Sequence, residues 1–493
     1  MMMPPGIPEL GKIINRSALR DRVVQFGTGM LLRALPDWLI DRANDDKESG
    51  AGIVMVKSTS PQKGPLDDQN GFYTVIERGL HAGKPIDRPR IIRCVTRVLA
   101  AETEWESILA CARNPEIDLI ISNTTEAGLV YQPEMISRDT PPKSFPAKLT
   151  RYLLERFEAF HGDPLMGMVV LPTELLVDNG KLLLDYVLRH ATANGYPDSF
   201  LDWVRLHNRF CSTLVDRIVP GRCEPDDVVT CEGITFIDRA HTAAEPYLLW
   251  AIEGDEEVRR RLWFAGSDSR VIVTHELSPY REQKLRILNG SNTMVAAVGW
   301  LAGCRTTFDT MTDPLVSRYV ESLIAEEILP TIRGTCPDAE SFAAETLDRF
   351  RNEAIRYPLL TIARQYTAKM NSRNVETVFR YAESGRLPFR CIIGLAAYMV
   401  FHEAKQEDGN WYGSRNGERY PYIDDHAQSV CAVCSGMGAE RHSVRQAVLK
   451  LFGDATLFSR NLTTIPGLAD AVTDSIIAIR EKGMAEVLRN ADF

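Results

Sequence analysis

Short apolar runs bounded by turn residues alternate with amphipathic stretches from residue 22 to about residue 248. This alternation is typical of α/β folds, and apolar runs without polar interruption are typical of parallel strands covered on both faces. We predict strands at 23–26, 53–56, 119–122 and 168–171. We predict helices between and after them at 31–43, 104–113, 146–161 and 180–190.

The pattern changes beyond about residue 278, where strand-like runs become rare. Long helix-compatible segments dominate this half of the chain, at 284–301, 314–327, 339–356, 386–405 and 468–489. The sequence therefore predicts a mostly α-helical second domain. We place the boundary between residues 266 and 279, which gives domains of 1–270 and 271–493.

Composition and charge narrow the range of partners. The 493 residues carry a formal net charge of −9, with 44% hydrophobic and 25% charged residues, as in an ordinary globular protein. Acidic residues outnumber basic ones, so the sequence does not indicate the wide basic surface that nucleic-acid binding needs. The longest apolar runs are about half the length of a bilayer-spanning helix, so we expect no membrane partner.

The cysteines and histidines predict neither disulfides nor a metal centre. Ten cysteines are too few for a disulfide scaffold and favour the reducing cytoplasm. Cys431 and Cys434 form a CxxC pair, but no second pair or histidine lies at zinc spacing, so we interpret them as incidental thiols on one helix. The nine histidines form no cluster with metal-ligand spacing.

A glycine motif follows the first predicted strand. Phe26, Gly27, Thr28 and Gly29 lead into a helix, and such a turn suits a pyrophosphate held at the positive end of that helix. The usual third glycine is replaced by Leu32. Because the motif follows the first strand of an α/β domain, we predict a Rossmann-like dinucleotide-binding domain at the N-terminus.

The end of the second predicted strand bears on the choice between NAD and NADP. An NAD-preferring site usually has an acidic residue there, whereas this chain has Lys57, Ser58 and Thr59. Lys57 is compatible with the 2′-phosphate of NADP, and it is equally compatible with a solvated lysine. We expect NAD as the cofactor, with NADP as the open alternative.

A polar loop follows the third predicted strand. Asn123, Thr124, Thr125 and Glu126 stand where ligands of open α/β sheets bind, at the carboxyl ends of the strands. These residues suit contacts to ribose or nicotinamide edges. They also suit a capping motif for the next helix, and the sequence alone does not separate the two interpretations.

A further candidate group opens the predicted helical domain. Lys284, Asn289 and Asn292 lie on one predicted helix, whose start is able to direct them into one cleft. By the residues alone, a solvated lysine with capping amides is the simpler interpretation.

Six collinear motifs change this assessment, because together they resemble the long-chain polyol dehydrogenase family of mannitol dehydrogenases and hexuronate reductases. The chain is most similar to the tagaturonate (altronate) type of reductase over nearly its whole length. The motifs occupy residues 25–29, 122–126, 172–180, 214–220, 245–246 and 284–290.

The resemblance implies a zinc-independent, nicotinamide-dependent oxidoreductase in which a lysine is the general base. Carried over by position, Lys284 is that base, and Asn179 and Asn289 hold the reacting oxygen. The family motif continues with a histidine where this chain has Asn292, which donates a hydrogen bond but does not change charge near neutral pH.

For a hexuronate, the resemblance also implies cations that pair with the substrate carboxylate. Lys369 and Arg373 stand where uronate-type relatives carry Lys and Arg, and Glu126 is a further expected substrate contact. Without the resemblance, cations four residues apart on a helix would be read as a solvated face. We interpret Asp216 and Arg217 as a buried structural ion pair.

These observations predict reversible hydride transfer between a nicotinamide cofactor and a sugar acid, with tagaturonate and altronate as the preferred pair. The enzymatic alternatives are a fructuronate reductase and a neutral polyol dehydrogenase. The non-enzymatic alternative is a dinucleotide or sugar-acid sensor, which the replacement by Asn292 motivates. We expect a monomer or a small homo-oligomer that binds small molecules only.

Overall fold

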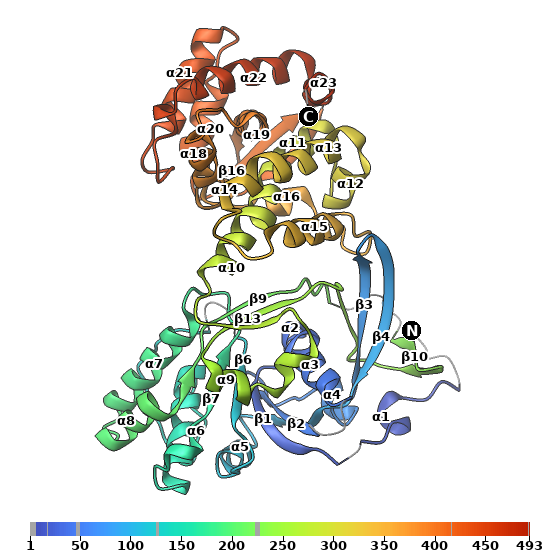
Figure 1. Ribbon diagram of the computed structural model, residues 1–493, viewed down its shortest axis with the longest axis vertical. Coiled ribbons are helices and arrows are strands. Elements are labelled where there is room, and N and C mark those ends of the chain that lie inside the picture. Colours follow the sequence, from blue (N-terminus) through green and yellow to red (C-terminus); the bar gives the residue numbers. More distant parts are fainter. Residues whose placement is uncertain are drawn as a thin grey trace. The chain divides into compact units, whose positions relative to one another are not determined.

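The computed structural model of the chain describes residues 6–16, 18–45, 50–124, 128–221, 227–415, 417–491 and 493. It divides into two compact units (Figure 1). The first comprises Met1–Arg78 and Pro85–Leu277, and the second Gly79–Lys84 and Ser278–Phe493. The predicted boundary at residue 270 lies just before this division.

A six-stranded sheet forms the centre of the first unit, and all of its pairs are parallel. The strand order is β5-β2-β1-β6-β7-β8, in which the chain moves outward from β1 to one side and then to the other. This is the strand order of dinucleotide-binding Rossmann folds. The strands are β1 (Arg20–Phe26), β2 (Ala51–Lys57), β5 (Val95–Ala100), β6 (Leu119–Ser122), β7 (Val169–Pro172) and β8 (Arg209–Phe210).

Helices cover both faces of this sheet, and alternate residues of each strand supply the two cores. On β1, Val23 packs with Leu39 of α3, whereas Val24 packs with Leu149 of α6. Burial on both sides explains why the strands read as continuous apolar runs. The helices are α2 (Met30–Ala34), α3 (Pro36–Ala43), α5 (Trp105–Ala112), α6 (Phe145–Ala159), α7 (Asn179–Ala193) and α8 (Asp198–His207).

The register of the sheet aligns the strand ends that matter for a ligand. Phe26 pairs with Val56 on one side and with Ser122 on the other, and Ser122 pairs with Pro172. The loops that follow β1, β2, β6 and β7 therefore emerge at one edge of the sheet, where ligands of such folds bind.

Smaller elements that the sequence did not predict complete the first unit. The hairpin of β3 (Tyr73–His81) and β4 (Lys84–Ile92) pairs with β12 (Thr242–Ala244), and a second sheet contains β9 (Thr213–Asp216), β13 (Leu249–Glu253) and β14 (Val271–Thr274). The remaining elements are α1 (Leu10–Ile13), α4 (Pro65–Asp68), β10 (Val228–Cys231), β11 (Ile234–Ile237), α9 (Glu256–Arg261) and the 3₁₀ turns Pro164–Met166 and Trp263–Ser267.

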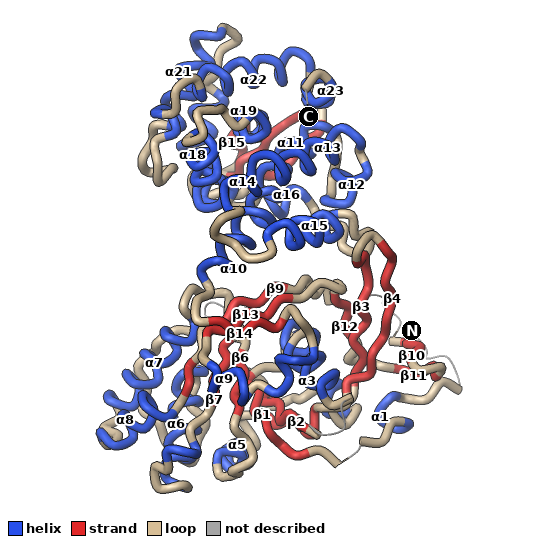
Figure 2. The backbone as a smooth tube through the Cα atoms, in the orientation of Figure 1, coloured by secondary structure: helices blue, strands red, loops and turns tan. Residues whose placement is uncertain are grey.

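The second unit is mostly helical, as predicted, with one small antiparallel sheet (Figure 2). That sheet contains β15 (Ala404–Glu407), β16 (Asn410–Arg415) and β17 (Glu418–Tyr422). The α-helices are α10 (Ser278–Gln283), α11 (Ser291–Ala302), α12 (Thr307–Thr312), α13 (Pro314–Ser322), α14 (Leu329–Ile332), α15 (Ala339–Phe350), α16 (Leu359–Ile362), α17 (Tyr366–Met370), α18 (Glu376–Ala382), α19 (Phe389–Phe401), α20 (Ala427–Ser435), α21 (Arg441–Phe452), α22 (Leu468–Lys482) and α23 (Met484–Arg489).

Three segments of this unit are π-helical, at Lys284–Gly290, Leu323–Ile328 and Asn371–Val375. Each one continues directly into α-helix on both sides. The π-helix is rare and often marks functional positions, because its extra residue re-aims the side chains around it.

Several predicted helices end earlier or break, for local reasons. The predicted helix at 31–43 breaks at Leu35, because the following Pro36 disfavours helical backbone at the residue before it. The helix predicted at 468–489 breaks at Gly483, which has a φ of 81°.

The nine described cysteines are all buried and free. Cys431 and Cys434 lie on α20, as expected for incidental thiols on one helix. Burial raises the pKa of each described thiol above its usual value.

Candidate active site

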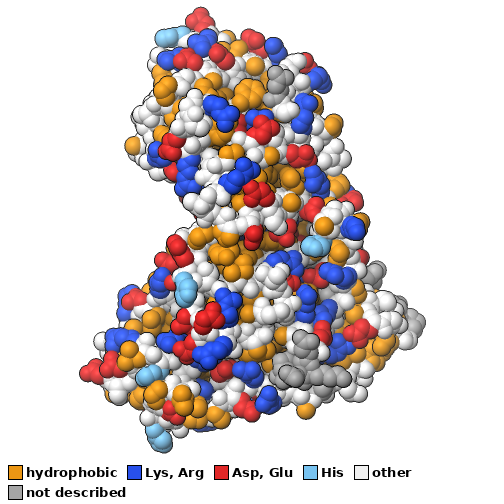
Figure 3. Space-filling view, viewed as in Figure 1, with side chains coloured by type: hydrophobic (Ala, Val, Ile, Leu, Met, Phe, Trp, Pro, Cys, Tyr) orange, Lys and Arg blue, Asp and Glu red, His pale blue; other side chains and the backbone are white. Residues whose placement is uncertain are grey.

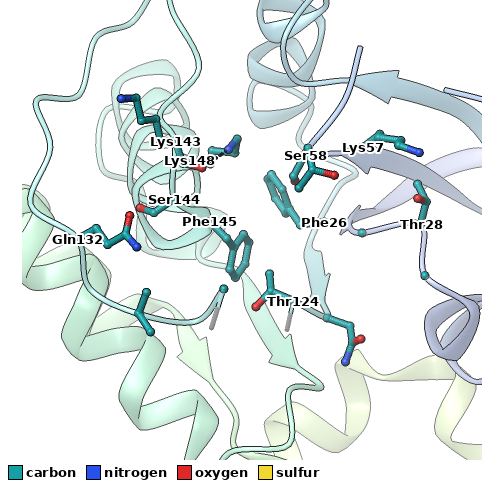
Figure 4. A pocket seen from close by; sticks show the side chains of 16 residues that line it. Phe26, Thr28, Lys57, Ser58, Thr124, Gln132, Lys143, Ser144, Phe145 and Lys148 are labelled. Carbon is teal, nitrogen blue, oxygen red and sulfur yellow. Dashed lines mark hydrogen bonds between the residues drawn. The ribbon is translucent and has the colours of Figure 1, made fainter. Parts of the chain in front are cut away.

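A cavity of about 430 Å³ opens at the edge of the sheet where β1, β2 and β6 end (Figure 4). Its walls come from the glycine turn, the end of β2, the loop after β6 and the start of α6. Seven predicted cofactor contacts line it: Phe26, Gly27, Thr28, Gly29, Lys57, Asn123 and Thr124. The structure thus brings together the described residues that were predicted to bind the dinucleotide, while Thr125 lies outside the described residues.

The two glycines of the turn have different reasons to be glycine. Gly27 has a φ of +129°, and a Cβ there would lie 2.8 Å from Cδ1 of Leu32 and 3.2 Å from the carbonyl oxygen of Asn123. Leu32, which replaces the third glycine, thus packs against the first. A Cβ at Gly29 meets no atom within 4 Å, so the backbone there faces open space that a ligand is able to approach.

Lysines stand on two sides of the cavity. Lys57 and Thr28 lie across the opening from Lys143 and Lys148 (Figure 4). Lys148 is buried and donates from Nζ to the carbonyl oxygen of Lys143 at 2.7 Å, and burial lowers the pKa of its ammonium. The cavity therefore favours an anionic ligand.

The loop after β6 is held by the residues that follow β7. Asn123 donates from Nδ2 to the carbonyl and hydroxyl oxygens of Thr173, at 2.9 and 3.0 Å. The buried carboxylate of Glu174 accepts from the hydroxyl of Ser122 at 3.0 Å and from the backbone N–H of Thr124 at 2.9 Å. Burial raises the pKa of Glu174, and these hydrogen bonds oppose the rise. Glu126, predicted to contact substrate, lies outside the described residues.

Asn179 occupies a structural position at the start of α7. Its amide is fully buried, and Nδ2 donates to the carbonyl oxygens of Pro172, Glu174 and Thr213, at 3.1, 2.9 and 3.3 Å. Its Oδ1 accepts from the backbone N–H of Thr213 at 2.8 Å. Both amide protons are used by the backbone, so this geometry gives no support to a direct hydrogen bond from Asn179 to the reacting oxygen.

In the second unit, Lys284 and Asn289 lie in the π-helical segment Lys284–Gly290. Residues five apart on an α-helix project about 140° away from each other, at about 100° per residue. A π-helical turn links residue i to residue i+5, which brings two such residues to the same side. The π-helix therefore places Lys284 and Asn289 on the same side of the turn.

Asn292 begins the next turn, on α11, and is half-buried. Its Oδ1 is buried and has no hydrogen-bond partner among the described residues. An unpaired buried acceptor costs roughly 1–3 kcal/mol unless a ligand or water donates to it.

Arg373 lies in the neighbouring π-helical turn Asn371–Val375, which is joined to this segment by hydrogen bonds. Arg286 donates from Nη1 to the carbonyl oxygens of Ser372 and Arg373, at 3.0 and 2.8 Å. Arg373 in turn donates from Nη1 to the hydroxyl of Thr293 at 3.1 Å, one residue beyond Asn292.

Lys369 lies close to other cations. It donates from Nζ to the carbonyl oxygen of Ile362 at 2.9 Å. Partial burial, followed by the charges of Arg373 and Arg364, lowers the pKa of its ammonium to about 8. The lowered pKa shows that these positive charges repel one another. A bound carboxylate offsets that repulsion, so the group is suited to a carboxylate ligand.

The predicted ion pair of Asp216 and Arg217 is corrected in part. Arg217 is buried, as expected, but its guanidinium donates to the carboxylate of Glu77 at 2.7 Å and to the carbonyl oxygen of Glu245 at 3.0 Å. It therefore ties β3 to the segment after β9 within the first unit.

Residues 21–265 match the Rossmann domain of mannitol dehydrogenase, and residues 276–479 match the mannitol dehydrogenase C-terminal domain. The chain belongs to the mannitol dehydrogenase family. It is thus an oxidoreductase of CH–OH groups with a Rossmann-like domain followed by a helical domain, which confirms the family and fold predicted from the sequence.

Within the mannitol dehydrogenase family, the chain is similar to altronate oxidoreductases. It is 38% identical to that of Pectobacterium carotovorum over 474 residues, which are 94% of this chain and 95% of the relative. It is 36% identical to that of Escherichia coli O7:K1 over 475 residues, which are 95% of this chain and 96% of the relative.

Two solved structures share the fold. A D-sorbitol dehydrogenase superposes with a TM-score of 0.75 at 19% identity, covering 98% of both chains. The mannitol 2-dehydrogenase of Pseudomonas fluorescens, solved with NAD and D-mannitol, superposes with a TM-score of 0.62 at 21% identity, covering 99% of this chain and 96% of the other.

The sequence did not single out Lys143 and Lys148, which line the cavity, or Glu174, which holds the loop after β6. Lys143 and Lys148 flank the start of a helix whose amphipathic pattern indicates only packing, and Glu174 was treated only as part of a motif. The signal for Glu174 was its position just after a buried strand, at the edge of the sheet where ligands bind.

Neither a metal-binding cluster nor a membrane-spanning helix occurs among the described residues. No group of three or more His, Cys, Asp or Glu side chains in the described ranges is placed to hold a metal ion. In the same part of the chain, no helix has the length and apolar character needed to cross a bilayer.

Proposed function

We propose that this chain catalyses the reversible, NAD(H)-dependent reduction of tagaturonate to altronate. One observation carries the proposal: the π-helical turn with Lys284 and Asn289 is bonded, through Arg286, to the turn that bears Arg373. An acid–base group and a carboxylate-binding group thus belong to one small assembly of the second unit. The names of the relatives at 36–38% identity support the choice of sugar acid.

The cofactor cavity fits a dinucleotide. Gly29 leaves backbone open to a pyrophosphate at the start of a helix, and Asn123 and Thr124 present a fixed polar edge. When bound there, a nicotinamide dinucleotide supplies the hydride for reduction and accepts it in oxidation.

Lys284 moves the proton. In the reduction it donates a proton to the substrate oxygen as the carbonyl becomes an alcohol, and in the oxidation it removes that proton. The side-chain N–H of Asn289 donates a hydrogen bond to the same oxygen and stabilises its developing negative charge.

The remaining groups orient the sugar acid. Lys369 and Arg373 pair with the carboxylate, whose charge the net charge of −9 of the protein would otherwise repel. Asn292 accepts a hydrogen bond from a substrate hydroxyl at its unpaired Oδ1. An amide therefore takes a binding role at the position where the family has a histidine.

A spectrophotometric assay of NADH oxidation with tagaturonate, fructuronate and fructose tests the proposal. We expect the highest kcat/KM with tagaturonate. A higher value with fructuronate or fructose would replace tagaturonate as the substrate. If none of them is reduced while NADH binds, the chain is a binding protein rather than an enzyme of this class.

A further inference from the structure

A second cavity, of about 350 Å³, adjoins the cofactor cavity in the first unit. The two share Thr28 and Lys57, so these residues form the wall between them. The second cavity is lined by Thr28, Met30, Arg33, Lys57, Lys63, Gly64, Pro65, Leu66, Arg239, Ala240 and His241. Four of these side chains are cationic and none is acidic.

The cations differ in how far their charge is already balanced. Lys63 pairs with Asp67 at 3.1 Å and with Glu104 at 3.4 Å, and Arg239 pairs with Glu9 at 3.0 Å. Those carboxylates stand outside the lining and hold the two cations in place. Lys57 forms no ion pair with any residue that the structure describes, so its charge is available to a ligand.

The position of Lys57 connects this charge to the dinucleotide. It is the last residue of β2, and β2 is the neighbour of β1 in the sheet. In Rossmann folds the end of this strand meets the adenosine ribose, where a carboxylate selects NAD and a cation accommodates a 2′-phosphate. Here a lysine stands at that point, and the same lysine also lines the second, cation-rich cavity.

We propose that this second cavity binds the 2′-phosphate of NADP(H), so that the enzyme accepts the phosphorylated dinucleotide as well as NAD(H). The inference rests on the proposed nicotinamide-dependent function and specifies its cofactor class. A phosphate monoester carries close to two negative charges near pH 7 and accepts several charge-assisted hydrogen bonds. Lys57 supplies the unbalanced charge, and Lys63, in the loop that follows β2, supplies a second donor.

Calorimetry with two fragments of the cofactor tests the site without any turnover. Adenosine 2′,5′-bisphosphate carries the 2′-phosphate, and 5′-AMP lacks it but is otherwise the same. We expect the bisphosphate to bind at least about 10-fold more tightly than 5′-AMP, as one charge-assisted contact predicts.

Three variants locate the effect. Lys57→Ala and Lys63→Gln are expected to lower the ratio of the two affinities, each by about 5-fold or more. Lys181→Gln is the matched control, because it removes one lysine charge from the same unit at an exposed position on α7 outside either lining. It is expected to leave the ratio unchanged.

Three outcomes would overturn the inference. Equal affinity for the two fragments, no binding of the bisphosphate, or a ratio that falls equally in the Lys181→Gln control would each do so. The proposed function fails separately, through absence of NADH oxidation with tagaturonate. A protein that oxidises NADH with tagaturonate but binds the bisphosphate no better than 5′-AMP retains the function and loses this site.

Discussion

The guanidinium of Arg373 donates a hydrogen bond to the hydroxyl of Thr293 at 3.1 Å. That hydroxyl in turn donates to the carbonyl oxygen of Asn289 at 2.8 Å. A continuous chain of hydrogen bonds therefore runs from the proposed carboxylate-binding cation to the turn that bears Lys284. Thr293 is buried, so this chain is protected from exchange with solvent.

Replacing the hydroxyl that joins these groups should loosen Arg373 without removing its charge. We expect Thr293→Val to raise KM for tagaturonate several-fold and to change kcat less, because the guanidinium loses one of its fixed contacts. Thr310→Val is the matched control, since Thr310 is also buried in the second unit and its hydroxyl donates to the carbonyl oxygen of Thr307. Steady-state kinetics that show equal changes in both variants would argue for a general loss of packing.

Arg373 itself should determine whether the substrate needs a carboxylate. Removing a charge-assisted contact costs about 1.5–3 kcal/mol, so Arg373→Ala should raise KM for hexuronates roughly 10- to 100-fold. A neutral polyol or ketose has no carboxylate and should be affected far less. Comparable rises in KM for tagaturonate and fructose would remove Arg373 from the carboxylate site.

The pH dependence of substrate binding should reflect Lys369. Its ammonium has a pKa lowered to about 8, so it is charged below this pH and loses its proton above it. We expect KM for tagaturonate to rise with pH above about 8 in the wild type. In Lys369→Arg the charge persists and the rise should disappear, whereas KM that stays flat through pH 9 in the wild type would exclude a binding role for this charge.

Lys284→Ala tests the proton-transfer step. Loss of a general acid–base group lowers the rate about 10²- to 10⁴-fold, so turnover should nearly vanish while calorimetry still detects NADH binding. Small primary amines added to the solution should restore part of the activity, because they replace the missing proton donor. Substantial activity without added amine, or none with it at any concentration, would count against this role.

Glu174 should act on the cofactor by positioning the loop after β6. In Glu174→Gln a neutral amide oxygen replaces the carboxylate oxygen that accepts from Ser122 and Thr124, which weakens both hydrogen bonds. We expect the affinity for NADH to fall by about 1–3 kcal/mol, or roughly 5- to 100-fold, with a smaller change in KM for the sugar acid. Glu155→Gln removes a buried carboxylate on α6 outside the cavity lining, and its NADH affinity should stay near that of the wild type.

The parallel sheet was predictable because its strands are buried on both faces. Val23 and Val24 enter different cores, so both faces of the strand favour apolar residues. The helical character of the second half was predictable for a similar reason, since its apolar spacing is continuous. The small sheet of β15 to β17 was not, because its start overlaps a segment that reads as the end of a helix.

The cavity at the end of β1 was predictable where one short motif forms its wall, as at Gly27 and Gly29. It was not predictable where contacts depend on distant residues. Arg217 pairs with Glu77, 140 residues away in the chain, rather than with its neighbour Asp216. The π-helical turn was not predicted, because one inserted residue shifts the apolar positions only slightly. The same shift occurs in an α-helix with an irregular apolar face, so the sequence pattern does not separate the two.

Because its cysteines are buried, chemical labelling of their thiols measures how often the folded chain opens. Alkylating reagents attack the thiolate, and burial with a raised pKa suppresses that form at all nine described positions. A Cys223→Ser variant removes the tenth thiol from the measurement. In that background, labelling of cysteines such as Cys94 and Cys391 reports transient exposure of the first and second units in turn. Peptide mass spectrometry gives the rate at which each cysteine is modified. A lower rate in the presence of cofactor or sugar acid measures how strongly that ligand suppresses opening of the unit that binds it.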